Sequence, residues 1–214
     1  MKHTVLMPFS RFKNIKTLNE GMDGQGVEWV PLIDGKPWQG TILNWIKPWG
    51  VDSLPRDDHG LPTINPGHWL CNAFLDAAPP EFFARDHYVS FITDDCLWCH
   101  NHWRRLQAHF KGSPALVMCA TLGPGGNLIP AVYGRSGKMW ENNTCRCFVT
   151  RFEALTVRAD LLKDVRFGSA WCADGLLIER LCEENYGSIA FANDTCVYFN
   201  ALQPEQWGFP KDRI

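Results

Sequence analysis

Short apolar runs alternate with amphipathic segments over the first part of the chain. Residues 4–9 are almost all apolar, which predicts a buried strand. Apolar residues at helical spacing follow in 10–20, and residues 27–33 form a second apolar run that ends at Asp34. A strand, a helix and a strand within about thirty residues predict a βαβ unit, so we expect the sheet to begin parallel.

The alternation resumes after a long irregular segment, residues 35–67, which is rich in Gly, Pro and Trp. We expect helices at 68–77, 100–110, 159–162 and 175–184, and strands at 88–93, 115–121, 128–133, 145–150, 155–157, 188–192 and 195–199. The chain contains no internal repeat, low-complexity segment or linker. The pattern therefore predicts one α/β domain, with a central mixed and mainly parallel sheet flanked by helices.

Composition narrows the classes of partner. The net charge is −2 and there is no long basic run, so we do not expect a nucleic acid to bind. No apolar stretch approaches the about 18 residues that a membrane-spanning helix needs. Nine cysteines cannot all pair, and no secretory segment opens the sequence. Together these features indicate reduced thiols and a cytoplasmic location.

Two adjacent carboxylates, Asp94 and Asp95, follow the strand predicted to begin at Tyr88. Acids at the end of a buried strand lie at the carboxyl edge of the sheet, where open α/β sheets bind ligands. Because neighbouring carboxylates repel each other, they favour a partner of positive charge, and oxygen ligands suit Mg²⁺ or Mn²⁺. The alternative is an ordinary turn, since Asp is a common turn residue.

The order of these parts resembles a GT-A-fold glycosyltransferase, a Rossmann-related fold, over most of the chain. The resemblance rests on Val5–Arg11, the strand ending at Asp34, the acids Asp94 and Asp95, and Trp171-Cys-Ala-Asp174 before a helix. The size and the Trp and Cys content are similar to small glycosyltransferase domains encoded by chlorella viruses, which would place the protein in the host cytoplasm. The resemblance implies one domain over residues 1–214, with a nucleotide-binding half, 1–98, and an acceptor half, 99–214.

The resemblance also implies where a nucleotide sugar, most naturally a UDP sugar, would bind. The residues it assigns to the nucleotide are Pro8, Phe9, Ser10, Arg11, Asp34, Asn72 and Asp94. Asp34 would hydrogen-bond the uracil, and Asp94 would contact the ribose or the metal. The acceptor would be a hydroxyl of a glycan or glycoprotein.

Metal binding and catalysis are implied at three acids. Asp95 would hold Mn²⁺ or Mg²⁺ with Asp94, and Asp174 would be the general base of an inverting transfer, although a retaining outcome stays open. Thr93 stands where the family's motif has its first acid, and the late metal-binding His of the family is absent. An Asp just before a helix is also a common N-cap, which is the structural alternative for Asp174.

Other motifs point to different classes of site. The run Cys96-Leu-Trp-Cys99-His100 matches the haem c attachment pattern, although export would be required. Zinc is a stronger rival, with candidate ligands Cys96, Cys99, His100, His102, Cys145 and Cys147. The alternatives to a transferase are therefore a non-catalytic zinc- or carbohydrate-binding module, the latter using Trp38, Trp45 and Trp49, or a sugar-phosphate nucleotidyltransferase.

Overall fold

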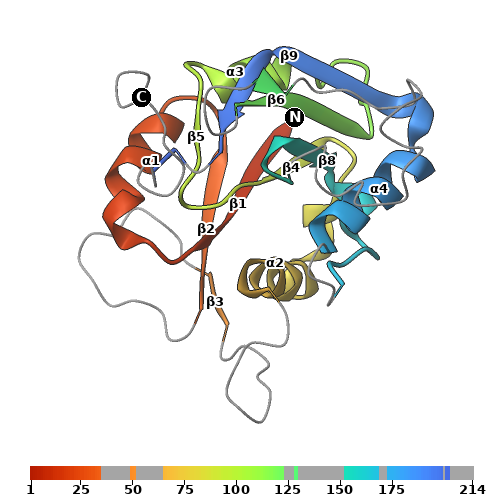
Figure 1. Ribbon diagram of the computed structural model, residues 1–214. Coiled ribbons are helices and arrows are strands. Elements are labelled where there is room, and N and C mark those ends of the chain that lie inside the picture. The colour runs from red at the N-terminus through yellow and green to blue at the C-terminus, as the bar shows by residue number, and fades with distance from the viewer. Residues whose placement is uncertain are drawn as a thin grey trace, which may run out of the picture.

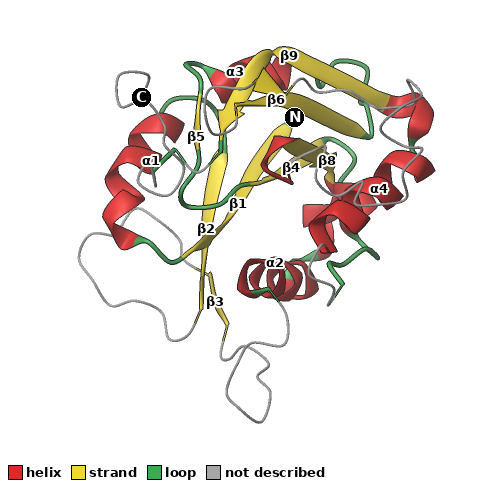
Figure 2. Cartoon of the chain, viewed as in Figure 1, coloured by secondary structure: helices red, strands yellow, loops and turns green. Residues whose placement is uncertain are grey.

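The computed structural model describes residues 1–34, 49–51, 65–122, 128–129, 152–168, 173–199 and 201–202. Within them, one sheet of nine strands lies between helices (Figures 1 and 2). The strands are β1 (Lys2–Phe9), β2 (Glu28–Asp34), β3 (Trp49–Val51), β4 (His87–Phe91), β5 (Leu97–Trp98), β6 (Leu116–Leu122), β7 (Leu128–Ile129), β8 (Leu155–Arg158) and β9 (Ile189–Tyr198). The α-helices are α1 (Ile15–Met22), α2 (Pro66–Ala77), α3 (His102–Ala108) and α4 (Ala173–Glu184). Short 3₁₀ turns are η1 (Phe12–Asn14), η3 (Pro80–Phe83), η6 (Phe152–Ala154), η7 (Ala159–Leu162) and η8 (Tyr186–Ser188).

The sheet is mixed, and its strand order is β3-β2-β1-β4-β8-β6-β9-β5, with β7 paired to β6. Strands β1 to β4 are parallel to one another, β8 is antiparallel to both β4 and β6, and β9 is parallel to β6. The expected βαβ unit and the parallel start are therefore confirmed. Strands β1, β2, β3, β4, β6 and β9 all end at one edge, which we call the carboxyl edge.

Strand β1 lies at the centre of the parallel part, with β2 on one side and β4 on the other. The chain first winds outward through β2 and β3 and then crosses back to β4 (Figure 1). The connections from β1 and to β4 therefore lead to opposite sides of the boundary between these two strands, and this boundary is a topological switch point. In open α/β sheets, ligands bind outside the carboxyl ends of the strands at such a point.

The central strands are buried on both faces, which explains why they read as continuous apolar runs. On one face, Leu6 packs in a cluster that includes residues of α2 and α4. On the other face, Val5 and Met7 pack with residues of α1 and α3. Two helices therefore cover each face of the sheet.

The C-terminal strand differs from the expectation. The two strands expected at 188–192 and 195–199 form one strand, β9, which pairs with β6 on both sides of a bulge. Cys119 is opposite Ala192, whereas the next residue, Ala120, is opposite Cys196, so residues 193–195 are extra. The sequence predicts a break at the polar residues Asn193 and Asp194, but a bulge accommodates unpaired residues without ending the strand.

Candidate functional site at the carboxyl edge

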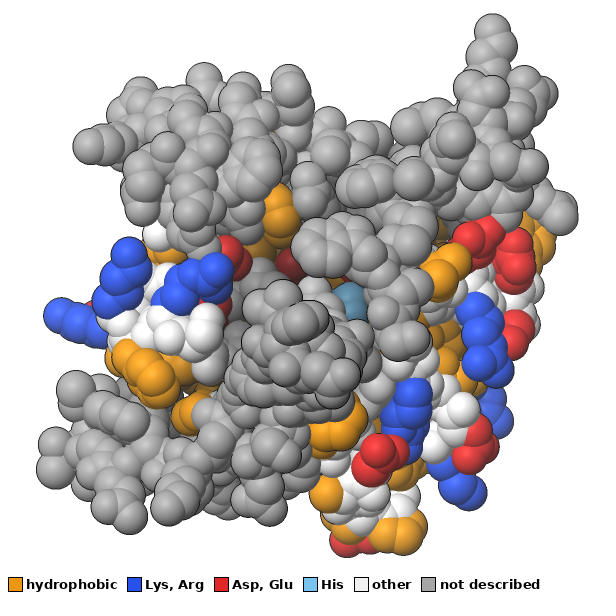
Figure 3. Space-filling model, turned by 60° about the horizontal axis from the view of Figure 1, so that its bottom comes forward, with side chains coloured by type: hydrophobic (Ala, Val, Ile, Leu, Met, Phe, Trp, Pro, Cys, Tyr) orange, Lys and Arg blue, Asp and Glu red, His pale blue; other side chains and the backbone are white. Residues whose placement is uncertain are grey.

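Two loops meet at the switch point. Ser10 and Arg11 follow β1, and Asp94 and Asp95 form the turn after β4. Because β1 and β4 are adjacent and parallel, these loops lie side by side at the carboxyl edge. Figure 3 brings this edge forward, and acidic and histidine side-chain atoms are visible near the centre of the view.

Asp94 is buried and receives several donors from the β1 loop. Its Oδ2 accepts from the backbone N–H of Ser10 at 2.6 Å, from the N–H of Arg11 at 2.5 Å and from the Ser10 hydroxyl at 3.3 Å. The Arg11 guanidinium donates to Oδ1. A carboxylate offers about four lone-pair sites. Three of the four donors reach Oδ2 and one reaches Oδ1, so the first role of Asp94 is to fix the β1 loop against the β4 turn.

Asp95 is also buried. Its Oδ1 accepts from the Thr93 hydroxyl at 2.7 Å, and its Oδ2 lies 3.5 Å from Arg11 Nη2, beyond ordinary hydrogen-bond length. The guanidinium of Arg11 thus lies against both acids and balances their mutual repulsion. Thr93, which breaks the match to the family's acidic motif, has a positive function here as a donor to Asp95.

Glu153 is a third acid at this edge that the sequence analysis did not select. It lies in η6, just before β8, and its Oε1 is 3.4 Å from the Thr93 hydroxyl. Because β8 runs antiparallel to β4, the start of β8 reaches the same edge as the end of β4. Only the position of β8 in the sheet brings Glu153 there, so no local sequence pattern could have identified it.

The donor set fits a cation only in part. Among the described residues, no group of three or more His, Cys, Asp or Glu side chains could hold a metal ion. Mg²⁺ and similar ions are often bound by one or two carboxylates, with substrate phosphates and water completing the shell. Asp95 fits that type of site, whereas Oδ2 of Asp94 is already occupied by donors of the β1 loop and its Oδ1 by Arg11.

The first turns of α2 and α4 form the neighbouring part of the edge. Both helices lead into strands that end at the carboxyl edge, so both helices begin there. His68, in the first turn of α2, is 7% exposed, and its ring stacks on Phe167 with centroids 4.8 Å apart. Its Nδ1 has no hydrogen-bond partner among the described residues. Burial lowers the pKa of His68, and the nearby charge of Asp174 opposes that shift.

Asp174 lies inside the first turn of α4, so it is not the residue before the helix that an N-cap role requires. It is half-buried and near enough to His68 to influence its charge. The structure therefore places the expected catalytic acid within electrostatic range of a buried histidine. His68 is a residue that the sequence analysis did not select.

Three residues expected at the nucleotide have structural contacts. Asn72 donates from Nδ2 to the Phe167 carbonyl and accepts from the Phe167 N–H, both at 2.9 Å. Phe9 is buried against Phe12 and Trp29. Pro8 lies against the first turn of α2, because a Cβ added at Gly67 would be 3.4 Å from its ring.

Other expected residues lie partly or wholly outside the described part of the chain. Asp34 ends β2 and pairs in register with Val51, but its side chain is outside the described residues. The side chain of Trp49 at the start of β3 is outside as well, as are Trp38 and Trp45.

The Cys96–His100 motif does not form a single cluster. Cys96 is buried, with its Sγ 3.1 Å from the Thr93 hydroxyl, whereas Cys99 Sγ is 3.1 Å from the Thr195 hydroxyl in β9. His102 also contacts Thr195, and His100 is exposed. Cys145 and Cys147, the other candidate zinc ligands, lie outside the described residues.

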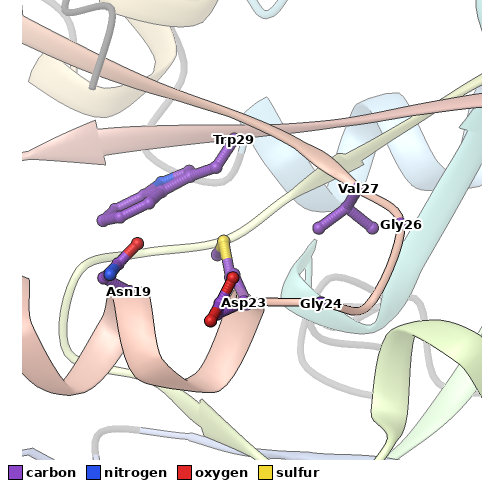
Figure 4. A pocket seen from close by; sticks show the side chains of 7 residues that line it. Asn19, Asp23, Gly24, Gly26, Val27 and Trp29 are labelled. Atoms are coloured by element: carbon purple, nitrogen blue, oxygen red, sulfur yellow. The ribbon is translucent and has the colours of Figure 1, made fainter. Parts of the chain in front are cut away.

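A pocket of about 210 Å³ lies elsewhere, between the C-terminal end of α1 and the start of β2. Figure 4 shows the Trp29 ring opposite Asn19, with Asp23 at the end of the helix. Since β2 begins at this end and finishes at the carboxyl edge, the pocket is at the opposite edge of the sheet from Asp95. The pocket is therefore separate from the acids at the carboxyl edge.

The chain matches no protein-family model, and no curated protein matches it in sequence. None of the described helices is long and apolar enough to span a bilayer.

Proposed function

We propose that this chain is a metal-dependent glycosyltransferase of the GT-A type. It would bind a nucleoside-diphosphate sugar, most naturally a UDP sugar, over the switch point between β1 and β4. The observation that carries the proposal is the meeting of Arg11, Asp94 and Asp95 at the carboxyl ends of these two strands. Topology favours a ligand at this place, and the charges favour a ligand that combines phosphates with a cation.

Asp94 and Asp95 would have different roles. Asp94, which accepts hydrogen bonds from the β1 loop, would keep Ser10 and Arg11 in position for the nucleotide. Asp95 would be the protein ligand of Mn²⁺ or Mg²⁺, with diphosphate oxygens completing the shell. When bound, the cation would neutralise charge on the leaving diphosphate as a Lewis acid. Arg11, whose side chain is 38% exposed, would supply a second positive charge next to the phosphates.

The acceptor side would be the first turns of α2 and α4. An inverting transfer needs a group that takes the proton from the acceptor hydroxyl, and Asp174 supplies a carboxylate there. His68 is kept neutral by burial and stacking, so it can orient a neighbouring hydroxyl through a hydrogen bond without adding charge. The acceptor would be a glycan or glycoprotein hydroxyl.

The proposal can be tested by thermal unfolding with UDP, with and without Mn²⁺. Ligand at about 100 times its Kd stabilises a protein by about 2.7 kcal/mol, which corresponds to a shift of about 5–10 °C for a chain of this size. We expect that shift only when both components are present. Asp95→Asn should abolish it, whereas Asp76→Asn, an exposed acid on α2, should retain it.

Other outcomes would favour the other classes. If UDP with Mn²⁺ gives no shift while a chelator alone unfolds the protein and releases zinc, the chain is a zinc module and the proposal fails. Formation of a nucleotide sugar from a nucleoside triphosphate and a sugar phosphate would identify a nucleotidyltransferase instead. If instead the shift with UDP and Mn²⁺ is observed, a screen of nucleotide sugars for slow hydrolysis in the presence of Mn²⁺ would identify the donor sugar.

A further inference from the structure

Two cysteines that are far apart in the sequence lie opposite each other at the edge of the sheet. In the antiparallel pair of β5 and β9, Leu97 is opposite Tyr198 and Trp98 is opposite Val197. Continuing this register by one residue places Cys99 opposite Cys196. The Cys99 N–H donates to the Cys196 carbonyl at 3.1 Å, which confirms that the pairing extends to this position.

The spacing of such a pair suits a disulfide. Directly opposed residues at a hydrogen-bonded position have Cα atoms about 5.5 Å apart, and disulfides span Cα distances of about 4.4–6.8 Å. The Cys196 N–H donates to Cys99 Sγ at 3.4 Å. Both side chains are partly exposed, whereas Trp98 and Val197, the adjacent pair, are buried on the other face.

The surroundings differentiate the two thiols. The bulge in β9 brings the Thr195 hydroxyl to 3.1 Å from Cys99 Sγ and to 2.6 Å from His102 Nδ1. Hydrogen bonds from Cys196, and then from His102 and Thr195, lower the pKa of Cys99, whereas the pKa of Cys196 is raised, first through its contact with Cys99. The Cys196 N–H donates to Cys99 Sγ and the Thr195 hydroxyl lies within hydrogen-bond distance of it, so these contacts favour a thiolate at Cys99. We therefore assign Cys99 the role of nucleophile and Cys196 the role of resolving thiol.

We propose that Cys99 and Cys196 are a redox-active pair that forms a reversible disulfide between β5 and β9, with a small-molecule disulfide such as oxidised glutathione as the oxidant. The Cys99 thiolate attacks one sulfur of glutathione disulfide, whose S–S bond breaks and releases one glutathione. Cys196 then loses its proton and attacks Cys99 Sγ, and this releases the second glutathione. Two electrons pass from the protein thiols to the oxidant, and two glutathione thiols result.

The disulfide would restrain the carboxyl edge of the sheet near Asp95. Strand β5 has two residues and is preceded directly by Asp95 and Cys96. Trp98 connects β5 to α1, because its Nε1 donates to the Gly21 carbonyl at 2.9 Å. A covalent link from Cys99 to β9 would fix this short strand and restrain the turn that contains Asp95. This consequence is independent of which ligand the carboxyl edge binds.

The test is to incubate the native protein with oxidised glutathione and to count thiols after denaturation. The reduced chain has nine thiols, and we expect the count to fall by two. Trypsin cleaves after Arg85, Arg104, Arg180 and Lys211, so the linked peptides are 86–104 and 181–211. Fragment ions must place the bond at Cys99 and Cys196, rather than at Cys96 or Cys182.

Single variants test the division of roles. Cys196→Ser should accumulate one glutathionyl group on Cys99, whereas Cys99→Ser should form neither the adduct nor the link. Cys182→Ser, which removes a buried thiol of α4, is the matched control and should behave as the native chain. At pH 6, alkylation of Cys99 should be at least tenfold faster than that of an unperturbed thiol, because more of it is thiolate.

The proposal is overturned if the thiol count stays at nine, or if the fragment ions place the link at other cysteines. It is also overturned if alkylation of Cys99 in the native protein is no faster than that of an ordinary thiol. The alkylation rate is measured on the native sequence, so it remains decisive even if a variant fails to fold.

Discussion

His3 provides a quantitative test of the buried polar interior. It lies in β1 with 3% of its surface exposed, between the rings of Trp103 and Phe110 at centroid distances of 5.6 and 5.1 Å. Its Nε2 is 2.9 Å from the Ser90 hydroxyl. Burial, and then the charges of other histidines, lower the pKa of His3 from 6.5 to about 3.

The sign of the pH dependence follows from this shift. Below pH 6.5 the unfolded chain binds a proton at His3 that the folded chain does not, so stability falls as the pH drops from 6.5 towards 3. Each pH unit within that window costs about 1.4 kcal/mol. Between pH 7 and pH 5, the contribution of His3 alone is a loss of about 2 kcal/mol.

The assay is urea unfolding, followed by Trp fluorescence, of the native chain and of His3→Gln at pH 7 and pH 5. The variant should lose about 1 kcal/mol at pH 7 through weaker hydrogen bonding and packing. Its further loss on going to pH 5 should be about 2 kcal/mol smaller than that of the native chain.

Equal pH dependence in the native chain and in His3→Gln would refute the reasoning. It would mean that the folded chain protonates His3 as readily as the unfolded chain does. The comparison between variants cancels the other histidines and the carboxylates, because they titrate in both proteins.

Three further predictions concern single contacts. Asp94→Asn should lower the free energy of unfolding by about 3 kcal/mol in urea melts, because it removes the carboxylate that pairs with Arg11 in a buried setting. An unchanged free energy of unfolding would contradict the role of Asp94 in holding the β1 loop. Gly21→Ala should lower the melting temperature, because its Cβ would lie 2.9 Å from the Trp98 ring. This clash should outweigh the helix propensity of Ala, which exceeds that of Gly by about 1 kcal/mol. A higher melting temperature would show that the Trp98 ring can move away from the new methyl group. Asn72→Ala should cost about 1–2 kcal/mol of stability in urea melts, because it removes both hydrogen bonds to the Phe167 backbone, and an unchanged free energy of unfolding would contradict this role.

Much of the fold could be predicted from local pattern. The buried runs of β1, β2 and β6 and the amphipathic helices α1 to α4 were identified within a few residues of their observed ends. The pattern also indicated that the sheet begins parallel, because a crossover helix separates β1 from β2. It failed at the bulge in β9, since local polarity does not distinguish a bulge from a break.

The candidate site divides in the same way. The sequence by itself placed Asp94 and Asp95 at the end of a buried strand and Asp174 at the start of a helix, because these positions depend on local order. The tertiary structure decided their surroundings. It places donors of the β1 loop on Asp94, Arg11 against both acids, Glu153 within reach of Thr93, and His68 within electrostatic range of Asp174. It also separated Cys99 from Cys96 and placed it opposite Cys196. Such pairings depend on strand order and register over many residues, which hydrophobic periodicity does not encode.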